Sequence, residues 1–300
     1  MSEARFQRSR LGSIRAVTYT VPDLKVIEET YTRWLGYNVI ARGPLPVEVA
    51  EAWRAPGVAH CPTLTLGPAS GEAVYLRFIE TAAAADWCAL KTHGWNVSEF
   101  VVQDVDALAA SLAESPFFII CPPASLTRFP MIRAMQVLGP FGECLYFTQV
   151  GPGSGLDLAP ARSFVGRVFI VVAGAPDLEA LLRSYSTFTN TIDPPVATPV
   201  RVISLVNDLP PETLHRHGLV KLGGGTLIEL DQYPPVTRAR KIAPDALPPG
   251  MAIVTFTVDH LPEHDDDQVH RVFLPDSEAP SLVWEGVAGE LIEFVESKDA

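Results

Sequence analysis

Four short segments of the chain share one pattern, and each places a polar side chain between apolar neighbours. The pattern is a glycine, two variable residues, an aliphatic residue, a tyrosine or glutamate, and then a leucine or phenylalanine. Its fifth positions are Tyr75, Tyr146, Glu229 and Glu293. On a β-strand such a residue faces away from its neighbours, so we expect these four side chains to point into hollows formed by their sheets. Carboxylates and phenols placed there could move protons or bind a substrate oxygen.

Glu229 and Glu293 are the main candidates for proton transfer, together with Arg167 and Tyr146. If both carboxylates point into one hollow, each raises the pKa of the other, and a nearby guanidinium opposes that rise. Such a group could act as a general acid–base pair while Arg167 stabilises an enolate or a carboxylate. In the alternative interpretation, the two glutamates are solvated or ion-paired strand residues.

The remaining polar strand residues are candidates for substrate binding. Tyr75 is either a core residue or a phenol that binds the oxygen of an aromatic substrate, and the same choice applies to Tyr146. Arg77 follows Tyr75 on the same face and is either a solvated strand end or an anchor for a substrate carboxylate. Glu99 lies inside an otherwise apolar strand, where a charge needs a partner.

The histidines are weaker candidates. His215 and His217 alternate before a strand, so an extended backbone points both rings the same way, into water or toward a ligand. We retain His217 as a substrate-binding candidate. His260 and His264 belong to an acidic stretch that is either a solvated loop or a site for an adventitious divalent ion.

The composition favours a small-molecule partner over a nucleic acid or a membrane. The formal net charge of −12 argues against phosphate binding, which needs a basic surface. No apolar run approaches the roughly 18 residues of a membrane helix, and the N-terminus lacks the apolar core of a secretory signal. The four cysteines form no CxxC pair and are expected to be free thiols. We therefore expect a cytoplasmic protein that binds a hydrophobic small molecule, and we leave open whether it forms a homodimer.

Each copy of the pattern closes one β-α-β-β-β unit. In the first unit an alternating strand from Ser13 runs into Asp23, and a helix with apolar residues at helical spacing ends at Gly36. Three strands follow. The same order begins again near Asn96, Gly166 and Met251, although the fourth unit has a poor helical sequence after its first strand. This repetition predicts an α+β protein built from one supersecondary unit used four times.

Four such units, a Val-x-Asp-Leu turn after the opening strand and a closing Gly-x-x-Ile-Glu-Leu strand resemble the vicinal oxygen chelate superfamily. That group includes glyoxalase I, bleomycin-resistance proteins, methylmalonyl-CoA epimerase and extradiol dioxygenases. The resemblance covers residues 13–296 and implies two glyoxalase-like domains, each a half-open barrel. We expect an N-terminal domain at 1–152, made of the first and second units, and a C-terminal domain at 160–300, made of the third and fourth.

The resemblance also implies a metal, held by a histidine of the opening strand and the glutamate of the closing strand. The corresponding opening-strand residues here are Ala16, Val97, Arg167 and Ile253. None of them is histidine, and an arginine repels a cation. The usual ligand set is therefore absent, and we expect no metal or other cofactor.

These observations favour a metal-independent enzyme of the lyase or isomerase type. It would use acid–base chemistry through an enol intermediate on a hydrophobic, aromatic-type small molecule, as in the catabolism of aromatic compounds. One alternative is an extradiol-type ring-cleavage dioxygenase that holds iron or manganese on rearranged ligands such as His215, His217 and Glu293. The other is a non-catalytic small-molecule-binding protein of the bleomycin-resistance type.

Overall fold

The computed structural model describes residues 10–84, 87–154, 158, 160–189, 191–262 and 268–297. The first unit contains β1 (Leu11–Val21), α1 (Leu24–Leu35), β2 (Asn38–Pro44), α2 (Val47–Ala52), the 3-10 helix η1 (Pro56–Val58), β3 (Pro62–Gly67) and β4 (Tyr75–Glu80). The second unit contains β5 (Gly94–Val102), α3 (Val105–Leu112), β6 (Phe118–Ser125), β7 (Ile132–Leu138) and β8 (Cys144–Val150).

The third unit contains β9 (Val165–Ala175), α4 (Leu178–Tyr185), β10 (Val196–Pro199), α5 (Arg201–Val206), β11 (Leu214–Lys221), the 3-10 helix η2 (Gly223–Gly225) and β12 (Leu227–Gln232). The fourth contains β13 (Gly250–Val258), β14 (His270–Arg271), β15 (Pro280–Glu285) and β16 (Leu291–Glu296). Within its described residues, the fourth unit has no α-helix; His264 and its acidic neighbours lie outside them.

An aspartate starts the helix that follows the opening strand in each of the first three units. Asp23, Asp104 and Asp177 each accept a hydrogen bond from the backbone N–H three residues later, at 2.9 to 3.0 Å. This bond satisfies one of the amides that a helix leaves unpaired at its N-terminus. At the other end of α1, Gly36 adopts φ 68°, a left-handed conformation that glycine reaches without strain. The repeated turn therefore works as a helix cap.

The sixteen strands of the described residues form two eight-stranded sheets, and each sheet joins one unit from each half of the chain. One has the order β14-β15-β16-β13-β1-β4-β3-β2, from the first and fourth units; we call it the outer-pair sheet. The other has the order β10-β11-β12-β9-β5-β8-β7-β6, from the second and third units; we call it the inner-pair sheet. In both sheets the opening strands of the two units pair antiparallel at the centre.

The expected α+β fold of two half-open barrels is confirmed, but the pairing of units differs from the expectation. Neither 1–152 nor 160–300 forms a sheet of its own, because β1 pairs with β13 and β5 pairs with β9. The physical reason is that all four opening strands have similar apolar faces. Local sequence therefore predicts that such strands pair, but it does not determine which opening strand pairs with which.

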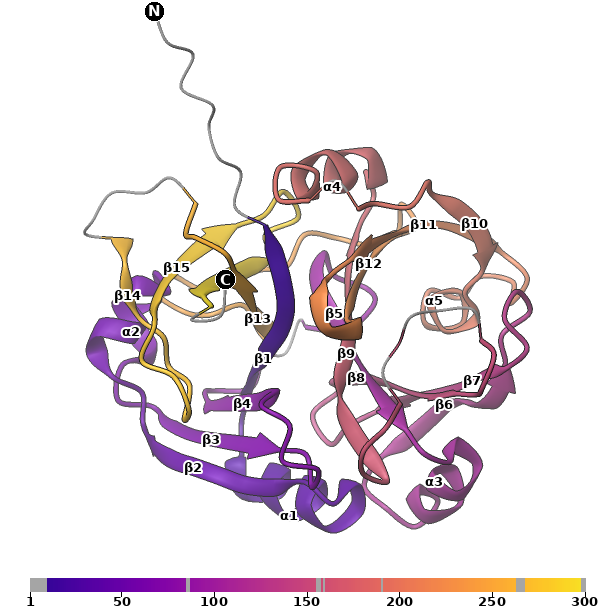
Figure 1. Cartoon of the computed structure of the whole chain (residues 1–300), viewed down its shortest axis with the longest axis horizontal. Coiled ribbons are helices and arrows are strands. Elements are labelled where there is room, and N and C mark those ends of the chain that lie inside the picture. The colour runs from indigo at the N-terminus through magenta and orange to yellow at the C-terminus, as the bar shows by residue number, and fades with distance from the viewer. Residues whose placement is uncertain are drawn as a thin grey trace, which may run out of the picture.

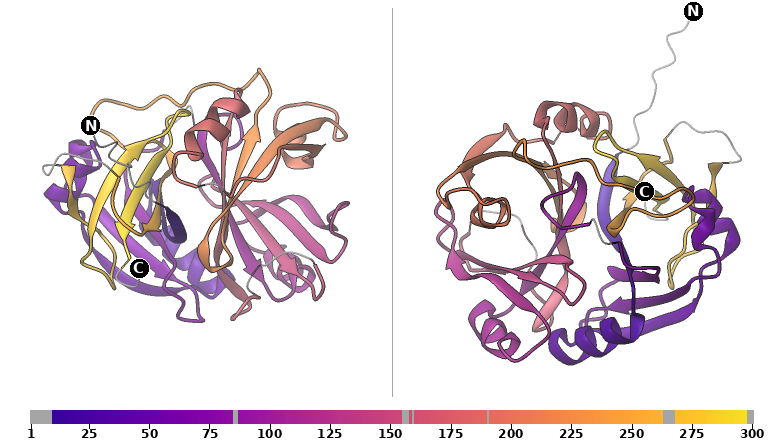
Figure 2. Two further views of the ribbon diagram at one scale, coloured as in Figure 1. Left: turned by 45° about the horizontal axis from the view of Figure 1, so that its top comes forward. Right: turned by 180° about the vertical axis from the view of Figure 1, so that it is seen from behind.

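Each sheet curls around its own interior, which contains α2 in the outer-pair sheet and α5 in the inner-pair sheet (Figure 1). Strand alternation divides the side chains between two environments. Along β1, Val17 and Tyr19 face the main core that the two sheets share with α1, α3 and α4, while Thr18 faces the interior. Tyr19 and Ser98 connect the sheets directly, with 2.6 Å between their hydroxyl oxygens. Figure 2 shows the two curled sheets side by side from two further directions.

Two glutamates that follow the glycine of the repeated pattern also join the sheets. Glu143, which precedes β8, accepts a hydrogen bond from the hydroxyl of Tyr31 on α1 at 2.9 Å. Glu290, which precedes β16, lies beside Tyr185 on α4 in the equivalent place, and no hydrogen bond of normal geometry joins the two side chains. Each pair connects a unit of one sheet to a unit of the other, and both carboxyl groups are buried. None of the described helices is long and apolar enough to cross a lipid bilayer.

Candidate functional site

Four ionisable side chains meet on the inward face of the inner-pair sheet. Glu99 comes from β5, Glu229 and Asp231 from β12, and His217 from β11. His217 lies directly opposite Asp231 in the sheet, and Glu229 shares their face because it lies two residues before Asp231. Ligand atoms of His217, Glu229 and Asp231 all lie within 4.8 Å of one another. Asp231 is fully buried, whereas His217 and Glu229 are half-buried, so the cluster is open on one side.

Burial and neighbouring charge disfavour the ionised forms of Glu99 and Asp231. Burial and the charge of Glu229 raise the pKa of Glu99 to about 8. A hydrogen bond from the Thr148 hydroxyl at 2.5 Å has the opposite effect and lowers this pKa. Burial raises the pKa of Asp231 well above its ordinary value, and the contact with Glu229 and the charge of Glu99 add to that rise. No arginine or lysine of the described chain pairs with these three carboxyl groups. The two buried carboxyl groups, Glu99 and Asp231, are therefore either protonated or balanced by a bound cation.

Several buried polar atoms around the cluster have no hydrogen-bond partner among the described residues. They are the hydroxyls of Tyr146 and Tyr233, Oδ1 of Asp231 and Nδ1 of His217. Unsatisfied buried atoms are rare in folded proteins, and each needs an explanation. Four such atoms in one place indicate a position where a ligand, an ion or ordered water completes the structure.

Tyr233 reaches this position because the opposing strand carries a glycine. A Cβ atom added to Gly174 on β9 would lie 2.1 Å from the Tyr233 ring. The ring therefore lies against the bare backbone of β9. Burial raises the pKa of Tyr233 and of Tyr146 well above the ordinary value, so both phenols remain hydrogen-bond donors at any physiological pH.

The donor set of His217, Glu229 and Asp231 fits a divalent cation. One imidazole nitrogen and two carboxylate oxygens are ligands that iron, manganese and zinc accept. Two of the three groups present a buried atom that lacks a partner, Nδ1 of His217 and Oδ1 of Asp231. A dication would also neutralise the excess negative charge. Both the geometry and the charge of these residues suit such an ion.

The interior of the outer-pair sheet has the opposite character. Arg77 and Glu293 form an ion pair at 2.9 Å, and both side chains are fully buried. Glu293 also accepts hydrogen bonds from Thr255 at 2.6 Å and from the Trp53 indole at 3.0 Å. Burial alone would raise the pKa of Glu293, but Arg77, His270 and Thr255 together hold it well below its usual value. These residues do not fit a divalent cation, because a guanidinium already neutralises the carboxylate.

The structure therefore separates residues that the sequence analysis placed together. Glu229 and Glu293 lie in different sheets, so they do not form one acid–base pair. Arg167 does not join either of them: its Nε lies 3.2 Å from Oε1 of Glu72, and it also donates to the carbonyl of Gly224. The expected convergence of Glu229, Glu293 and Arg167 in one hollow is wrong, because it assumed that the third and fourth units form one sheet.

The rearranged metal ligands proposed from the sequence are likewise divided. Of His215, His217 and Glu293, only His217 belongs to the cluster. His215 is buried and its Nε2 lies 2.8 Å from the Ser204 hydroxyl on α5. The structure does bring Glu229, Tyr146, Glu99 and His217 together in the inner-pair sheet. The other candidates, Tyr75, Arg77 and Glu293, lie in the outer-pair sheet.

Tyr75 lies at the edge of its hollow rather than at the centre. It packs against Ala16 and Val272 in a small apolar cluster. Burial raises the pKa of its phenol, and the neighbouring charge of Asp276 adds to the rise. No hydrogen bond joins Tyr75 to Arg77 or Glu293 within the described residues, which agrees with a packing role.

Two residues of the cluster were not identified from the sequence, Asp231 and Tyr233. The signal was present, because Glu229, Asp231 and Tyr233 alternate with other residues at the period of a strand. Such alternation places all three on one face. The repeated pattern ends one residue after Glu229, so it does not include Asp231 and Tyr233, which follow on the same side.

Comparison with known proteins supports the architecture. No family model matches the chain, and no curated protein matches it either. Among solved structures, glyoxalase I from Zea mays is similar with a TM-score of 0.58 and 16% sequence identity, over 96% of this chain and 92% of that one. A putative dioxygenase from Bacillus subtilis is similar with a TM-score of 0.62 and 11% identity, over 96% of this chain and 86% of that one. At such identities the similarity shows the fold alone.

Proposed function

Because the chain has the fold of the vicinal oxygen chelate superfamily, we propose that the interior of its inner-pair sheet is an enzyme active site. In this proposal His217, Glu229 and Asp231 bind a divalent cation, and the substrate is a small organic molecule with two adjacent oxygen atoms. One observation carries the proposal: the three ligand groups lie within 4.8 Å of one another, and two of them present buried atoms without a partner. The proposal adopts the metal-dependent alternative with a different ligand set from the one expected.

A divalent cation held there would polarise a substrate oxygen and lower the pKa of a substrate hydroxyl. The residues of the chain have separate tasks around it. Glu99, held by the Thr148 hydroxyl, is a carboxyl group that can exchange a proton near neutral pH. The hydroxyls of Tyr146 and Tyr233 lack partners and can donate hydrogen bonds to substrate oxygens.

The surroundings of the cluster favour a hydrophobic substrate. Val97, Val172 and Ile203 are buried on the same inward side, next to Tyr146 and Tyr233. Apolar walls with a few convergent polar groups are typical of small-molecule sites. They also exclude water from the ionisable groups, which strengthens every electrostatic interaction there. An aromatic molecule with adjacent hydroxyls, such as a catechol, meets these requirements.

Catechol is therefore the probe for the test. Calorimetry is used to titrate catechol into the full chain in two forms, one treated with a chelator and one loaded with Mn²⁺. We expect binding by the loaded form alone, and loss of that binding in Asp231→Asn. The Glu99→Gln variant should still bind catechol, because Glu99 is not a ligand of the proposed cation. Equal catechol binding by the chelator-treated protein would contradict the role of the cation.

A second candidate function is supported by the contact between Glu229 and Asp231. Ligand oxygens of the two carboxyl groups lie within 4.8 Å of each other, and burial together with the charge of Glu229 raises the pKa of Asp231, so that Asp231 can hold a proton when no cation is bound. A metal-independent acid–base enzyme could use this pair, as the sequence analysis expected for glutamates on closing strands. In that case chelator treatment leaves turnover intact, and Glu229→Gln abolishes turnover while ligand affinity remains. A protein that binds the ligand in both forms but never turns it over would instead be a binding protein.

A further inference from the structure

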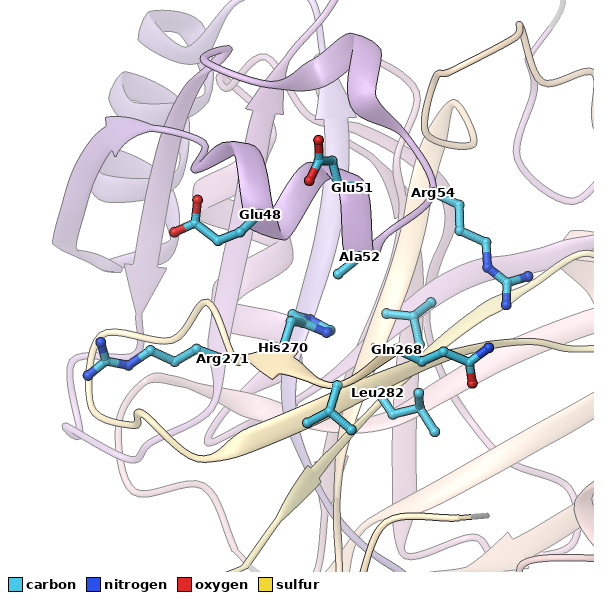
Figure 3. Close-up of a pocket in the computed structure, with 10 residues that line it drawn as sticks. Glu48, Glu51, Ala52, Arg54, Gln268, His270, Arg271 and Leu282 are labelled. Carbon is cyan, nitrogen blue, oxygen red and sulfur yellow. The ribbon is translucent and has the colours of Figure 1, made fainter. Parts of the chain in front are cut away.

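Two short helices lie inside the two sheets at equivalent places of their units. α2 follows the second strand of the first unit, and α5 follows the second strand of the third (Figure 1). Beside α2 is a cavity of about 440 Å³, and its rim carries Glu48, Glu51, Arg54 and Arg271 (Figure 3). Charges of both signs surround this cavity, so its rim does not favour one ligand charge. The surroundings of α5 are different, because Arg201 is the only charged residue of that helix.

Gln136 on β7 provides a free polar group on the inward face of the inner-pair sheet. It lies directly opposite Tyr146 on β8 and directly opposite Cys121 on β6. Residues that lie opposite one another in adjacent strands point to the same face of a sheet, so Gln136 faces the interior together with Tyr146. Its side chain is half-buried, and its carboxamide has no hydrogen-bond partner within the described ranges. The amide can therefore donate a hydrogen bond to a ligand.

Arg201, the first residue of α5, provides a free positive charge at the same place. The next residue, Val202, is buried in one apolar cluster with Cys121, and α5 contacts β6. Burial raises the pKa of the Cys121 thiol, and the positive charge of Arg201 opposes that rise, which requires the guanidinium to lie nearby. Arg201 is exposed and has no ion-pair partner in the described part of the chain. An unpaired guanidinium and an unpaired amide thus both lie close to Cys121.

Tyr146 connects this place with the proposed cation site. It lies between Gln136 and Glu99 in the sheet, because β8 is the strand between β7 and β5. Burial raises the pKa of Tyr146, and the charges of Asp231 and Glu229 add to that rise, so its hydroxyl lies near the cation cluster. One ligand can therefore reach the cluster with one end and Gln136 with the other.

We propose that Gln136 and Arg201 form a subsite for a carboxylate group of the substrate. This subsite rests on the proposed function, in which two adjacent oxygens of the substrate bind the cation, while a short chain carries the carboxylate to Gln136 and Arg201. A guanidinium presents paired N–H donors that match the two oxygens of a carboxylate, and the glutamine amide adds a further donor. A neutral substituent would leave the charge of Arg201 without a partner. The substrate class is therefore a carboxylic acid with two adjacent oxygens on an apolar body.

Three catechols that differ only at the end of one chain test the subsite. They are dihydrocaffeate, which carries a propionate chain, its primary amide, and isopentylcatechol, in which two methyl groups replace the carboxylate oxygens. Each is titrated by calorimetry into the Mn²⁺-loaded full chain. Dihydrocaffeate should bind about fivefold more tightly than its amide, and Arg201→Gln should abolish this preference. The affinity for dihydrocaffeate should also fall about fivefold in Gln136→Leu, which removes the amide donor.

Arg216→Gln is the matched control, because Arg216 on β11 is also exposed but pairs with Glu179 of α4 on the outward side of the sheet. This variant should keep the full preference for dihydrocaffeate. The subsite is overturned if the amide or isopentylcatechol binds the natural chain as tightly as dihydrocaffeate does, or if Arg201→Gln retains the preference. Arg201 is exposed, so its replacement leaves the fold intact and either result is interpretable.

A ligand without adjacent oxygens separates the subsite from the proposed function. Phenylpropionate is added to the ¹⁵N-labelled, chelator-treated full chain, and the side-chain amide signal of Gln136 is assigned by its loss in Gln136→Leu. The subsite predicts a saturable shift of this signal with phenylpropionate and a smaller shift with phenylpropanamide. Such a shift, together with catechol binding that needs no cation, would contradict the proposed cation and leave the subsite standing. No shift, with catechol still bound through Mn²⁺, would overturn the subsite alone.

Discussion

Arg77 and Glu293 form an ion pair at 2.9 Å in the interior of the outer-pair sheet, with neither side chain exposed to solvent. Glu229 occupies the matching position of the repeated pattern in the inner-pair sheet, where the described residues provide it with no arginine or lysine. One interior is thus internally neutralised, and the other retains unbalanced negative charge. Because of this asymmetry, the interior of the inner-pair sheet is the better candidate for an active site. The ion pair of the outer-pair sheet instead stabilises the fold.

Removal of one member of the buried pair should strongly destabilise the protein. Arg77→Met leaves the carboxylate of Glu293 buried without its counter-ion, and we expect the free energy of unfolding in urea to fall by about 3–5 kcal/mol. Adding Glu293→Gln to that variant should recover a large part of the loss, because no buried charge then remains.

The matched control is Arg42→Met, which removes a solvent-exposed ion pair with Glu28 at 2.6 Å. Its effect should be far smaller, because solvent screens exposed pairs. The structural account of the Arg77 pair fails if both arginine variants lose the same stability. It also fails if the losses from Arg77→Met and Glu293→Gln simply add.

The buried carboxyl groups of Glu143 and Glu290 should make the free energy of unfolding depend on pH. Burial raises the pKa of each carboxyl to about 7, although hydrogen bonds from backbone amides and, for Glu143, from Tyr31 lower it. In the unfolded chain a glutamate has a pKa of about 4.3, so between about pH 4.3 and 7 the folded state binds more protons. The free energy of unfolding should therefore fall as the pH rises through this range and level off above it.

Urea unfolding at about pH 5 and about pH 8 measures this effect. The Glu143→Gln/Glu290→Gln variant keeps hydrogen-bond acceptors but cannot ionise, so its loss of stability on going to the higher pH should be smaller. The difference from the natural chain should be on the order of 3 kcal/mol or more. An equal or steeper loss in the double variant would show that these two carboxyls are not the cause.

Gly174 should tolerate no side chain. A Cβ there would lie 2.1 Å from the buried Tyr233 ring, so Gly174→Ala must displace the ring or the strand. We expect a loss of about 1–3 kcal/mol in the free energy of unfolding. Gly43 on β2 is the matched control, since a Cβ there meets no atom within 4 Å; Gly43→Ala should change stability by less than about 0.5 kcal/mol. Equal effects of the two substitutions would contradict the packing of Tyr233 against β9.

The sequence was sufficient to predict the units but not their partners. Asp23 and its counterparts are local signals, because a helix cap needs only the residues that follow it. The pairing of β1 with β13 joins segments more than 200 residues apart, and no local pattern distinguishes it from the pairing of β1 with β5. The error about Glu229 and Glu293 follows directly from that missing information.

The candidate site could be predicted in part for the same reason. Glu229 and Tyr146 were identified because strand alternation is local, and alternation also identified His217. That His217 lies opposite Asp231 depends on the register of β11 and β12, which the sequence leaves open. Glu143 and Glu290, which follow the glycines of the repeated pattern, were not predicted to be important. Their neighbours Tyr31 and Tyr185 belong to the opposite sheets, and a local pattern does not reveal such proximity.

The most direct test of the central claim is a calorimetric titration of Mn²⁺ into the chelator-treated full chain. The account predicts a single site per chain, with affinity at least about tenfold weaker in Asp231→Asn and in His217→Gln, because each removes one ligand of the cluster. Absence of Mn²⁺ binding, or binding that both variants retain at full strength, would contradict a cation site at His217, Glu229 and Asp231.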